Sequence, residues 1–170
     1  MLGWLDQAAT GGGDGAHDLM RQIAAQLSAD GVTVRGAIQT NTPTGADCHC
    51  DMVLEVLGDD GPDVTISQDL GRESTGCRLD AGALEGAAQR VLDTLPAAQM
   101  VLLNKFGKQE ILGRGMVAVI AAAMERGLPV LISVAPQQRA EFLAFAGDLA
   151  VQLAPEDAAA WCRNAVQVPA

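Results

Sequence analysis

The chain has 170 residues, 49% of them hydrophobic but only 3% aromatic, and its 21 acidic against 11 basic residues give a net charge of −10. This length is enough for one buried core, which must be packed mainly from aliphatic side chains. The negative charge opposes contact with a nucleic-acid backbone or an anionic bilayer, so we expect neither as a partner, although a few local cations and backbone amides can still hold a small anion.

Hydropathy and composition predict where the protein works and how many domains it has. No apolar run approaches the roughly 20 residues that span a bilayer, and the first residues lack the basic segment of a signal peptide. We therefore expect a cytoplasmic protein whose four cysteines are thiols rather than disulfides. Because no repeat or change of composition interrupts the chain, we predict a single domain over residues 1–170.

The opening of the chain predicts a strand, a glycine-rich loop, a helix and a second strand. The apolar run Met1–Leu5 is followed by the loop Ala8–Asp18, a helically spaced apolar pattern that ends at Gly31, and a strand over Val32–Gln39. Four glycines crowd the loop: Gly11, Gly12, Gly13 and Gly15. Such a loop can present backbone N–H groups and the positive end of a helix to an anion, or it can be a flexible connector with nothing bound.

The middle of the chain predicts a hairpin and a capped helix. A turn-rich link over Asn41–Asp51 leads to the apolar runs Met52–Leu57 and Val64–Ser67, which are separated by a strong turn signal and indicate a β-hairpin. After a polar connection, Asp80 is suited to cap a helix that runs to about Leu95.

The stretch Met100–Glu110 predicts an apolar strand that stops at a charged turn. In an α/β sheet such strands deliver polar groups to the crevice at their carboxyl ends. The alternative is an ordinary solvated turn with two surface lysines. The polar residues of this turn are Asn104, Lys105, Lys108, Gln109 and Glu110.

The rest of the chain continues the alternation of helix and strand. A helix running to Gly127 precedes a buried strand over Leu128–Val134, and a short helix follows Pro136. A final strand over Asp148–Leu153 and a last helix opening at Pro155 complete the pattern, which is typical of a parallel sheet with helices on both faces.

Several segments resemble known families. The stretch GAHDLMRQIAAQLSADGVTVRGAIQT, with GCRLDAGALE and LLNKFGKQE, resembles the small nucleoside-triphosphatases of the THEP1-like group. The segments ISQDLG, GCRLD, LNKFGKQE and FAGDLAV resemble the bacterial domain of unknown function 2478, whose members are often associated with molybdenum-transport genes. These resemblances imply a three-layer α/β fold of the P-loop nucleoside-triphosphatase type with an antiparallel hairpin insertion, and they suggest molybdate or tungstate as a ligand.

The resemblance fails at the groups that would cut a triphosphate. In a phosphate-binding loop, G-x-x-x-x-G-K-[ST], the lysine meets the β- and γ-phosphates and the hydroxyl holds Mg²⁺. When Gly15 is aligned with the final glycine, Ala16 takes the place of the lysine and His17 that of the hydroxyl. Asn104 stands where an acidic metal partner is expected, and Lys105 replaces its glutamate neighbour. Mg²⁺-dependent hydrolysis is therefore not the expected activity.

The leading hypothesis is a non-hydrolysing protein that binds an oxyanion such as molybdate or tungstate, or a nucleotide phosphate, between the glycine loop and the turn after Leu103. A second is a nucleotide phosphohydrolase in which Lys105 or Lys108 replaces the missing lysine and Glu110 orients water. A third is an interaction module that has lost the site. Self-association is left open, and the sequence indicates no cofactor. The candidate ligand-binding residues are Gly11, Gly12, Gly13, Gly15, Ala16, His17, Asn104, Lys105, Lys108, Arg72 and Arg78.

The cysteines allow a second kind of site. Cys48, His49, Cys50 and Cys77 supply the thiolates and imidazole that zinc prefers, but a C-x-C pair with one distant cysteine is a weak zinc signal, and unpaired thiols near a loop are the alternative. Cys162 lies on an apolar helix face and is predicted to be a small core residue.

Overall fold

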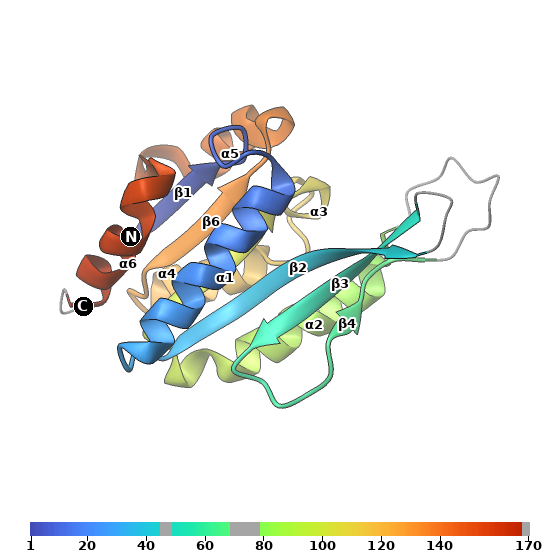
Figure 1. Ribbon diagram of the computed structural model, residues 1–170, viewed down its shortest axis with the longest axis horizontal. Coiled ribbons are helices and arrows are strands. Elements are labelled where there is room, and N and C mark those ends of the chain that lie inside the picture. Colours follow the sequence, from blue (N-terminus) through green and yellow to red (C-terminus); the bar gives the residue numbers. More distant parts are fainter. Residues whose placement is uncertain (45–48, 69–78, 168–170) are drawn as a thin grey trace.

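The computed structural model describes residues 1–44, 49–68 and 79–167, with the backbone alone for residues 42–44, 49 and 50. The described strands form a seven-stranded sheet in the order β4-β3-β2-β5-β6-β1-β7 (Figure 1). The strands from β2 to β7 in this order run parallel, whereas β3 and β4 are antiparallel to their neighbours. The strands are β1 (Leu2–Asp6), β2 (Val34–Thr44), β3 (His49–Leu57), β4 (Val64–Thr65), β5 (Met100–Phe106), β6 (Val130–Val134) and β7 (Ala150–Leu153).

Helices cover both faces of this sheet, as Figure 1 shows. They are α1 (Gly13–Ala29), α2 (Ala81–Thr94), α3 (Lys108–Ile111), α4 (Val117–Glu125), α5 (Arg139–Ala146) and α6 (Ala158–Gln167). Met20 of α1 and Cys162 of α6 share one buried cluster with Leu102, whereas α2, α4 and α5 share the other cluster with Leu103. The expected fold is confirmed: a three-layer α/β structure of the P-loop nucleoside-triphosphatase type with an antiparallel hairpin insertion.

The central strands are apolar along their length because both of their faces are covered. Every residue of β6 is buried, and so is every residue of β5 except Lys105. Helix α1 instead buries a single stripe with helical spacing, and it is followed by Gly31, whose φ of +80° suits the predicted cap. Asp80 caps α2 as predicted, because its Oδ1 accepts the N–H of Ala83 at 2.9 Å.

The antiparallel extension is larger than expected. The predicted link over Asn41–Asp51 is wrong, because residues 41–44 complete β2 and residues 49–51 begin β3. Beyond Ala37, β2 pairs with β3 and no longer with β5. Pro43, which has no backbone N–H group, therefore interrupts no pairing with β5. Pairing with a strand distant in sequence has overridden the local turn signal.

Helix α1 begins earlier than the glycine pattern indicated. Gly13 is already its first residue, and only Gly11 and Gly12, with φ values of 83° and 101°, keep a left-handed backbone in the loop before it. The loop is therefore the short stretch Gln7–Gly12. No helix among the described residues is long and apolar enough to cross a membrane.

One glycine decides whether β2 and β5 can pair. Gly36 has a φ of 134°, and a Cβ at this position would overlap the carbonyl oxygen of Leu102, its partner on β5. We predict that Gly36→Ala lowers the free energy of unfolding by about 2 kcal/mol, because a β-carbon is strained at this φ and collides with a neighbouring strand. Urea denaturation followed by circular dichroism measures the change.

Gly86→Ala is the matched control. Gly86 lies inside α2, and a Cβ there would meet no atom within 4 Å. This substitution should raise the free energy of unfolding by about 0.5–1 kcal/mol through helix propensity alone. Equal effects of the two substitutions would contradict the role given to Gly36.

The buried thiol of Cys162 gives a second prediction. Burial raises the pKa of Cys162 to about 12, because the thiolate would lose its hydration inside the sheet–helix layer. At pH 8 only on the order of one thiol in ten thousand is then ionised. In a variant carrying Cys48→Ser, Cys50→Ser and Cys77→Ser, Cys162 should resist Ellman's reagent until urea unfolds the chain. Rapid reaction of the folded variant would contradict the burial.

Candidate functional site

Hydrogen bonds fasten the loop after β1 to its first residue, Gln7. The carbonyl oxygen of Gln7 accepts the N–H of Gly12 at 2.8 Å and the hydroxyl of Thr10 at 3.0 Å. Gly15 packs so closely against Thr10 that a Cβ would overlap the Thr10 carbonyl oxygen. This close approach explains the glycine at the position aligned with the final glycine of a phosphate-binding loop.

A buried chain of hydrogen bonds fastens this loop to two neighbouring strands. The side-chain amide of Gln7 donates to the hydroxyl of Ser133 on β6 at 3.1 Å, and that hydroxyl donates to the backbone carbonyl of Asn104 on β5. Ser133 is fully buried. The carboxyl ends of β1, β6 and β5 are thus held together at one edge of the sheet. Sequence reasoning missed Gln7 and Ser133, although a lone serine within the apolar run of β6 was a usable signal.

Sequence reasoning also missed Asp6, whose two carboxylate oxygens each have a partner. One oxygen accepts the N–H of Ala8 at 3.0 Å, and the other pairs with the guanidinium of Arg139 at the start of α5. Asp6 is 7% exposed, so this pair shapes the loop rather than offering a free charge to a ligand.

Where β2 and β5 separate, the side chain of Asn104 makes hydrogen bonds to β2 in place of the backbone groups of β5. Its Oδ1 accepts the N–H of Gln39 at 2.7 Å, and its Nδ2 donates to the carbonyl oxygen of Gln39 at 2.9 Å. The regular pairing of the two strands ends two residues earlier, at Ala37. The backbone N–H of Gln39 needs an acceptor and its carbonyl oxygen needs a donor, so these two bonds determine which end of the Asn104 amide is oxygen and which is nitrogen.

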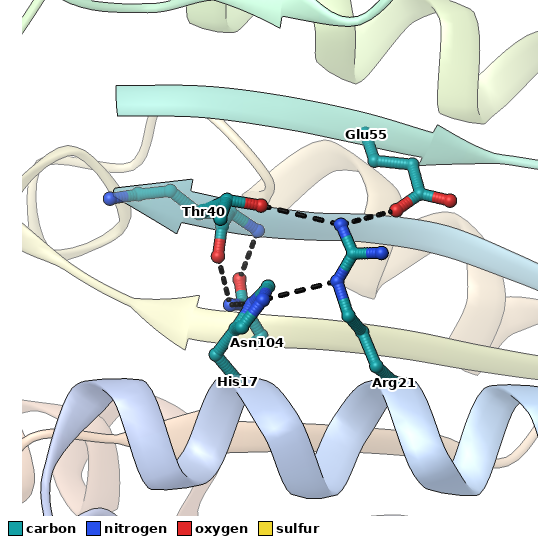
Figure 2. A network of polar contacts seen from close by, with 6 residues as sticks. His17, Arg21, Thr40, Glu55 and Asn104 are labelled. Atoms are coloured by element: carbon teal, nitrogen blue, oxygen red, sulfur yellow. Dashed lines mark hydrogen bonds and ion pairs between the residues drawn. The ribbon is translucent and has the colours of Figure 1, made fainter. Parts of the chain in front are cut away.

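The tip of this amide lies beside α1. Figure 2 shows His17 and Arg21 projecting from α1 toward the strands, with His17 next to Asn104. The Arg21 Nε donates to His17 Nε2 at 3.1 Å, while its guanidinium also reaches the Thr40 hydroxyl at 3.3 Å and the Glu55 carboxylate at 2.8 Å. Arg21 therefore holds the imidazole in place from the side of the hairpin.

These contacts assign the tautomer of His17. A guanidinium only donates, so His17 Nε2 must accept and the proton of the neutral ring lies on Nδ1. This Nδ1 is 3.5 Å from Asn104 Nδ2, which also carries hydrogen. Two N–H groups thus face each other, and a neutral imidazole cannot satisfy both neighbours. An acceptor oxygen placed between these two groups would satisfy both.

In the sequence alignment with a phosphate-binding loop, His17 and Asn104 take the places of magnesium ligands, and their chemistry does not fit that ion. Mg²⁺ prefers oxygen ligands, supplied in such loops by a hydroxyl and a carboxylate. Here the two positions hold His17 and Asn104, whose oxygen is already bonded to Gln39. Ala16, at the position of the lysine, is fully buried in the core and cannot reach a phosphate.

The other expected residues of the turn after β5 are placed elsewhere. The Asn104 side chain contacts His17 of α1, whereas Lys105 lines a pocket beside α2 that Asn104 also borders. Lys105 and Lys108 line a pocket on the α2 face, and none of the described residues that line it comes from the glycine loop. The structure therefore separates the two lysines from the glycine loop, whereas Asn104 borders both regions.

Glu110 holds the turn together. Its two carboxylate oxygens accept the N–H of Gly107 at 2.8 Å and that of Met116 at 3.0 Å, and the residue is 6% exposed. These bonds join the start of α3 to the start of α4. A role in orienting water would require this carboxylate to serve a ligand as well as two backbone amides.

The remaining expected residues lie wholly or partly outside the described structure. Arg72, Arg78, Cys48 and Cys77 are not among the described residues, and His49 and Cys50 are described only as backbone at the start of β3. Within the described part of the chain, no group of three or more His, Cys, Asp or Glu side chains is arranged to hold a metal ion. The proposed zinc site stays a prediction.

Comparison with known proteins identifies the family. The model of the family described as "Protein of unknown function (DUF2478)" matches residues 7–161, so the chain belongs to this family, as its motifs indicated. The chain is also 30% identical over 155 residues to the molybdenum import ATP-binding protein ModC 2 of Bradyrhizobium diazoefficiens. The match covers 89% of this chain but only 17% of that protein. No solved structure matches.

The geometry of Asn104 predicts the effect of restoring an acidic residue there. Asn104→Asp replaces the N–H that Gln39 O accepts with a carboxylate oxygen, which should lower the free energy of unfolding by about 1–3 kcal/mol at neutral pH. The deficit should shrink on acidification, since a protonated carboxyl group can donate again. Urea titrations at several pH values measure this change.

Asn41→Asp is the control for this substitution. The Asn41 side chain is exposed, and its oxygen accepts a hydrogen bond from the Gln39 side chain at 3.0 Å, which aspartate can also accept. This variant should unfold like the original chain. A neutral effect of Asn104→Asp would show that the Asn104 amide does not hold β2.

Proposed function

We propose that this protein binds a small oxyanion, such as molybdate, tungstate or a nucleotide phosphate, without hydrolysing it, at the edge of the sheet where β1 and β5 end. The observation that carries the proposal is the 3.5 Å contact between His17 Nδ1 and Asn104 Nδ2, since the hydrogen bond from Arg21 to His17 Nε2 implies that both of these nitrogens are donors. A tetrahedral oxyanion presents several acceptor oxygens, and one of them can accept from both groups. A cation placed there would meet two donors instead.

The start of α1 supports the same ligand class. The first intrahelical bond runs from the N–H of Ala16 to the carbonyl oxygen of Gly12 at 3.0 Å, so the N–H groups of Gly13, Asp14 and Gly15 precede the helical ladder. These amides and the helix dipole favour negative charge at this end. His17 follows within the next turn, so loop and imidazole belong to one continuous surface.

The residues at the aligned positions support the proposal that the protein does not hydrolyse its ligand. Clamping a triphosphate in this fold requires the loop lysine and the magnesium ligands, and each contributes several kcal/mol of charge stabilisation to the transition state. Ala16, His17 and Asn104 supply none of that charge in the described structure. Lys105 and Lys108 line a pocket on the other face, which weakens the alternative that they replace the loop lysine.

The choice of molybdate or tungstate rests on the relative. A stretch similar to this chain forms 17% of a protein named for molybdenum import and ATP binding. We propose that the present chain acts in molybdenum homeostasis. The same observation favours a second candidate function, an interaction module that works beside an ATP-binding protein. The stretch similar to this chain is part of a longer polypeptide that is named as an ATP-binding protein.

Equilibrium titration of the full chain with molybdate, tungstate, sulfate, ATP and GTP, followed by calorimetry, tests the proposal. At least one of these anions should bind without Mg²⁺, and His17→Phe should weaken that binding about tenfold, since one charge-assisted hydrogen bond is lost and the ring shape is kept. The proposal fails if none of the five ligands binds, or if ATP or GTP is turned over rapidly with Mg²⁺. Absence of binding combined with capture of an ATP-binding partner would support the interaction module.

Charge substitutions provide a second readout. Asp14 is exposed in the first turn of α1, where its carboxylate repels a bound anion. Asp14→Asn should raise anion affinity about threefold at low salt, with a smaller gain at high salt because the interaction is screened. Asp63→Asn, at an exposed position before β4, makes the same change of net charge and should have no effect. An equal gain from both substitutions would point to nonspecific attraction.

A further inference from the structure

A pocket on the α2 side of the sheet borders Asn104 but is lined by neither His17 nor the glycine loop. Its volume is about 540 Å³, which is within the range of small-molecule sites. It lies between the antiparallel strands, α2 and the turn that follows β5. The apolar side chains that line it are Ala37, Met52, Leu54, Ile66, Leu79, Leu84, Leu103, Leu112 and Met116.

The apolar lining is continuous with the core. Leu54, Leu84 and Leu103 belong to the buried cluster on the α2 face, each being at most 6% exposed. The floor of the pocket is therefore built by rigid secondary structure. Met52, which is half-buried on β3, lies beside it and can adapt its flexible thioether to an occupant.

The two cations among the described residues that line the pocket, Lys105 and Lys108, both lie at the turn after β5. Lys105 and Lys108 are exposed and form no ion pair with any described residue. The nearby carboxylate of Glu110 accepts hydrogen bonds from two backbone amides. In a chain with a net charge of −10, two lysines without an ion-pair partner among the described residues, at the end of an apolar pocket, are complementary to one anionic group.

Gln109 adds an independent sign of a ligand. Its side-chain Oε1 is buried and has no hydrogen-bond donor among the described residues, although such an oxygen normally has one. Gln109 lines the same pocket between the two lysines. A bound molecule with a hydroxyl or amide N–H near its anionic group would supply the missing donor.

We propose that this pocket binds a small amphipathic anion, with an apolar body against Leu54 and Leu103 and a carboxylate or similar head group at Lys105 and Lys108. The apolar contacts hold the body of the ligand, and the lysines select molecules that carry negative charge. The pocket extends to Asn104, which also belongs to the proposed oxyanion site, but neither His17 nor the glycine loop lines it.

Two fluorescent probes that share one ring system test the proposal. They are 1-anilinonaphthalene-8-sulfonate, which is anionic, and N-phenyl-1-naphthylamine, which lacks the sulfonate. The anionic probe should bind the folded chain in a one-to-one complex more tightly than the neutral probe, and decanoate should displace it while decanol should do so only weakly. Equal binding of the two probes, or several anionic molecules bound per chain, would overturn the proposal.

Substitutions test the charged part and the apolar part of the pocket separately. Replacing both lysines, Lys105→Gln with Lys108→Gln, should weaken the anionic probe about fivefold and leave the neutral probe unchanged, as expected for the loss of two exposed charge contacts. Met52→Trp should fill the apolar part and weaken both probes. Unchanged binding of the anionic probe to the lysine variant would refute the assigned head-group position.

A matched control removes the same amount of charge elsewhere. Arg126 and Arg163 are exposed and do not line the pocket, so Arg126→Gln with Arg163→Gln should leave the affinity for both probes as it was. A loss equal to that of the lysine variant would show that net charge alone attracts the anionic probe. Because molybdate binding is measured separately, failure of this proposal is distinguishable from failure of the oxyanion site.

Discussion

The hydrogen bonds between the Asn104 side chain and the backbone of Gln39 determine the chemistry at the edge of the sheet. They form where β2 separates from β5 to enter the antiparallel extension, and the amide takes over the pairing that the next backbone groups would have made. This use of the amide determines which of its atoms faces α1. Nδ2 is thereby directed at His17, so the amide presents a hydrogen-bond donor on the α1 side, and our proposal of an acceptor ligand rests on that orientation.

The order of strands explains why the expected residues do not form one cluster. β6 lies between β1 and β5, so the glycine loop and the turn after β5 start from strands that are not neighbours. Helix α1 brings His17 to Asn104, whereas Lys105, the next residue of β5, lines the pocket beside α2. The two sites that we propose therefore meet at Asn104.

Much of the fold was predictable because its elements carry local signals. The buried strands appear as continuous apolar runs, α1 carries an apolar stripe, and Asp80 caps α2 as its position suggested. The extent of β2 and β3 was not predictable in this way. Residues 41–44 carry turn-forming types, and only their pairing with β3, a contact between distant parts of the chain, makes them extended.

The amino-acid sequence by itself determined the layered α/β architecture, the family, and the loss of the lysine, hydroxyl and carboxylate that a triphosphatase needs, because these depend on residue type and spacing along one chain. Tertiary structure alone decided which side chains meet. Glu110 holds the turn between α3 and α4, Gln7 and Ser133 join three strands, and the lysines belong to a pocket on the far face. The reason is that contacts between segments distant in sequence, together with the irregularity of β5 between Leu103 and Phe106, decide which side chains share a site.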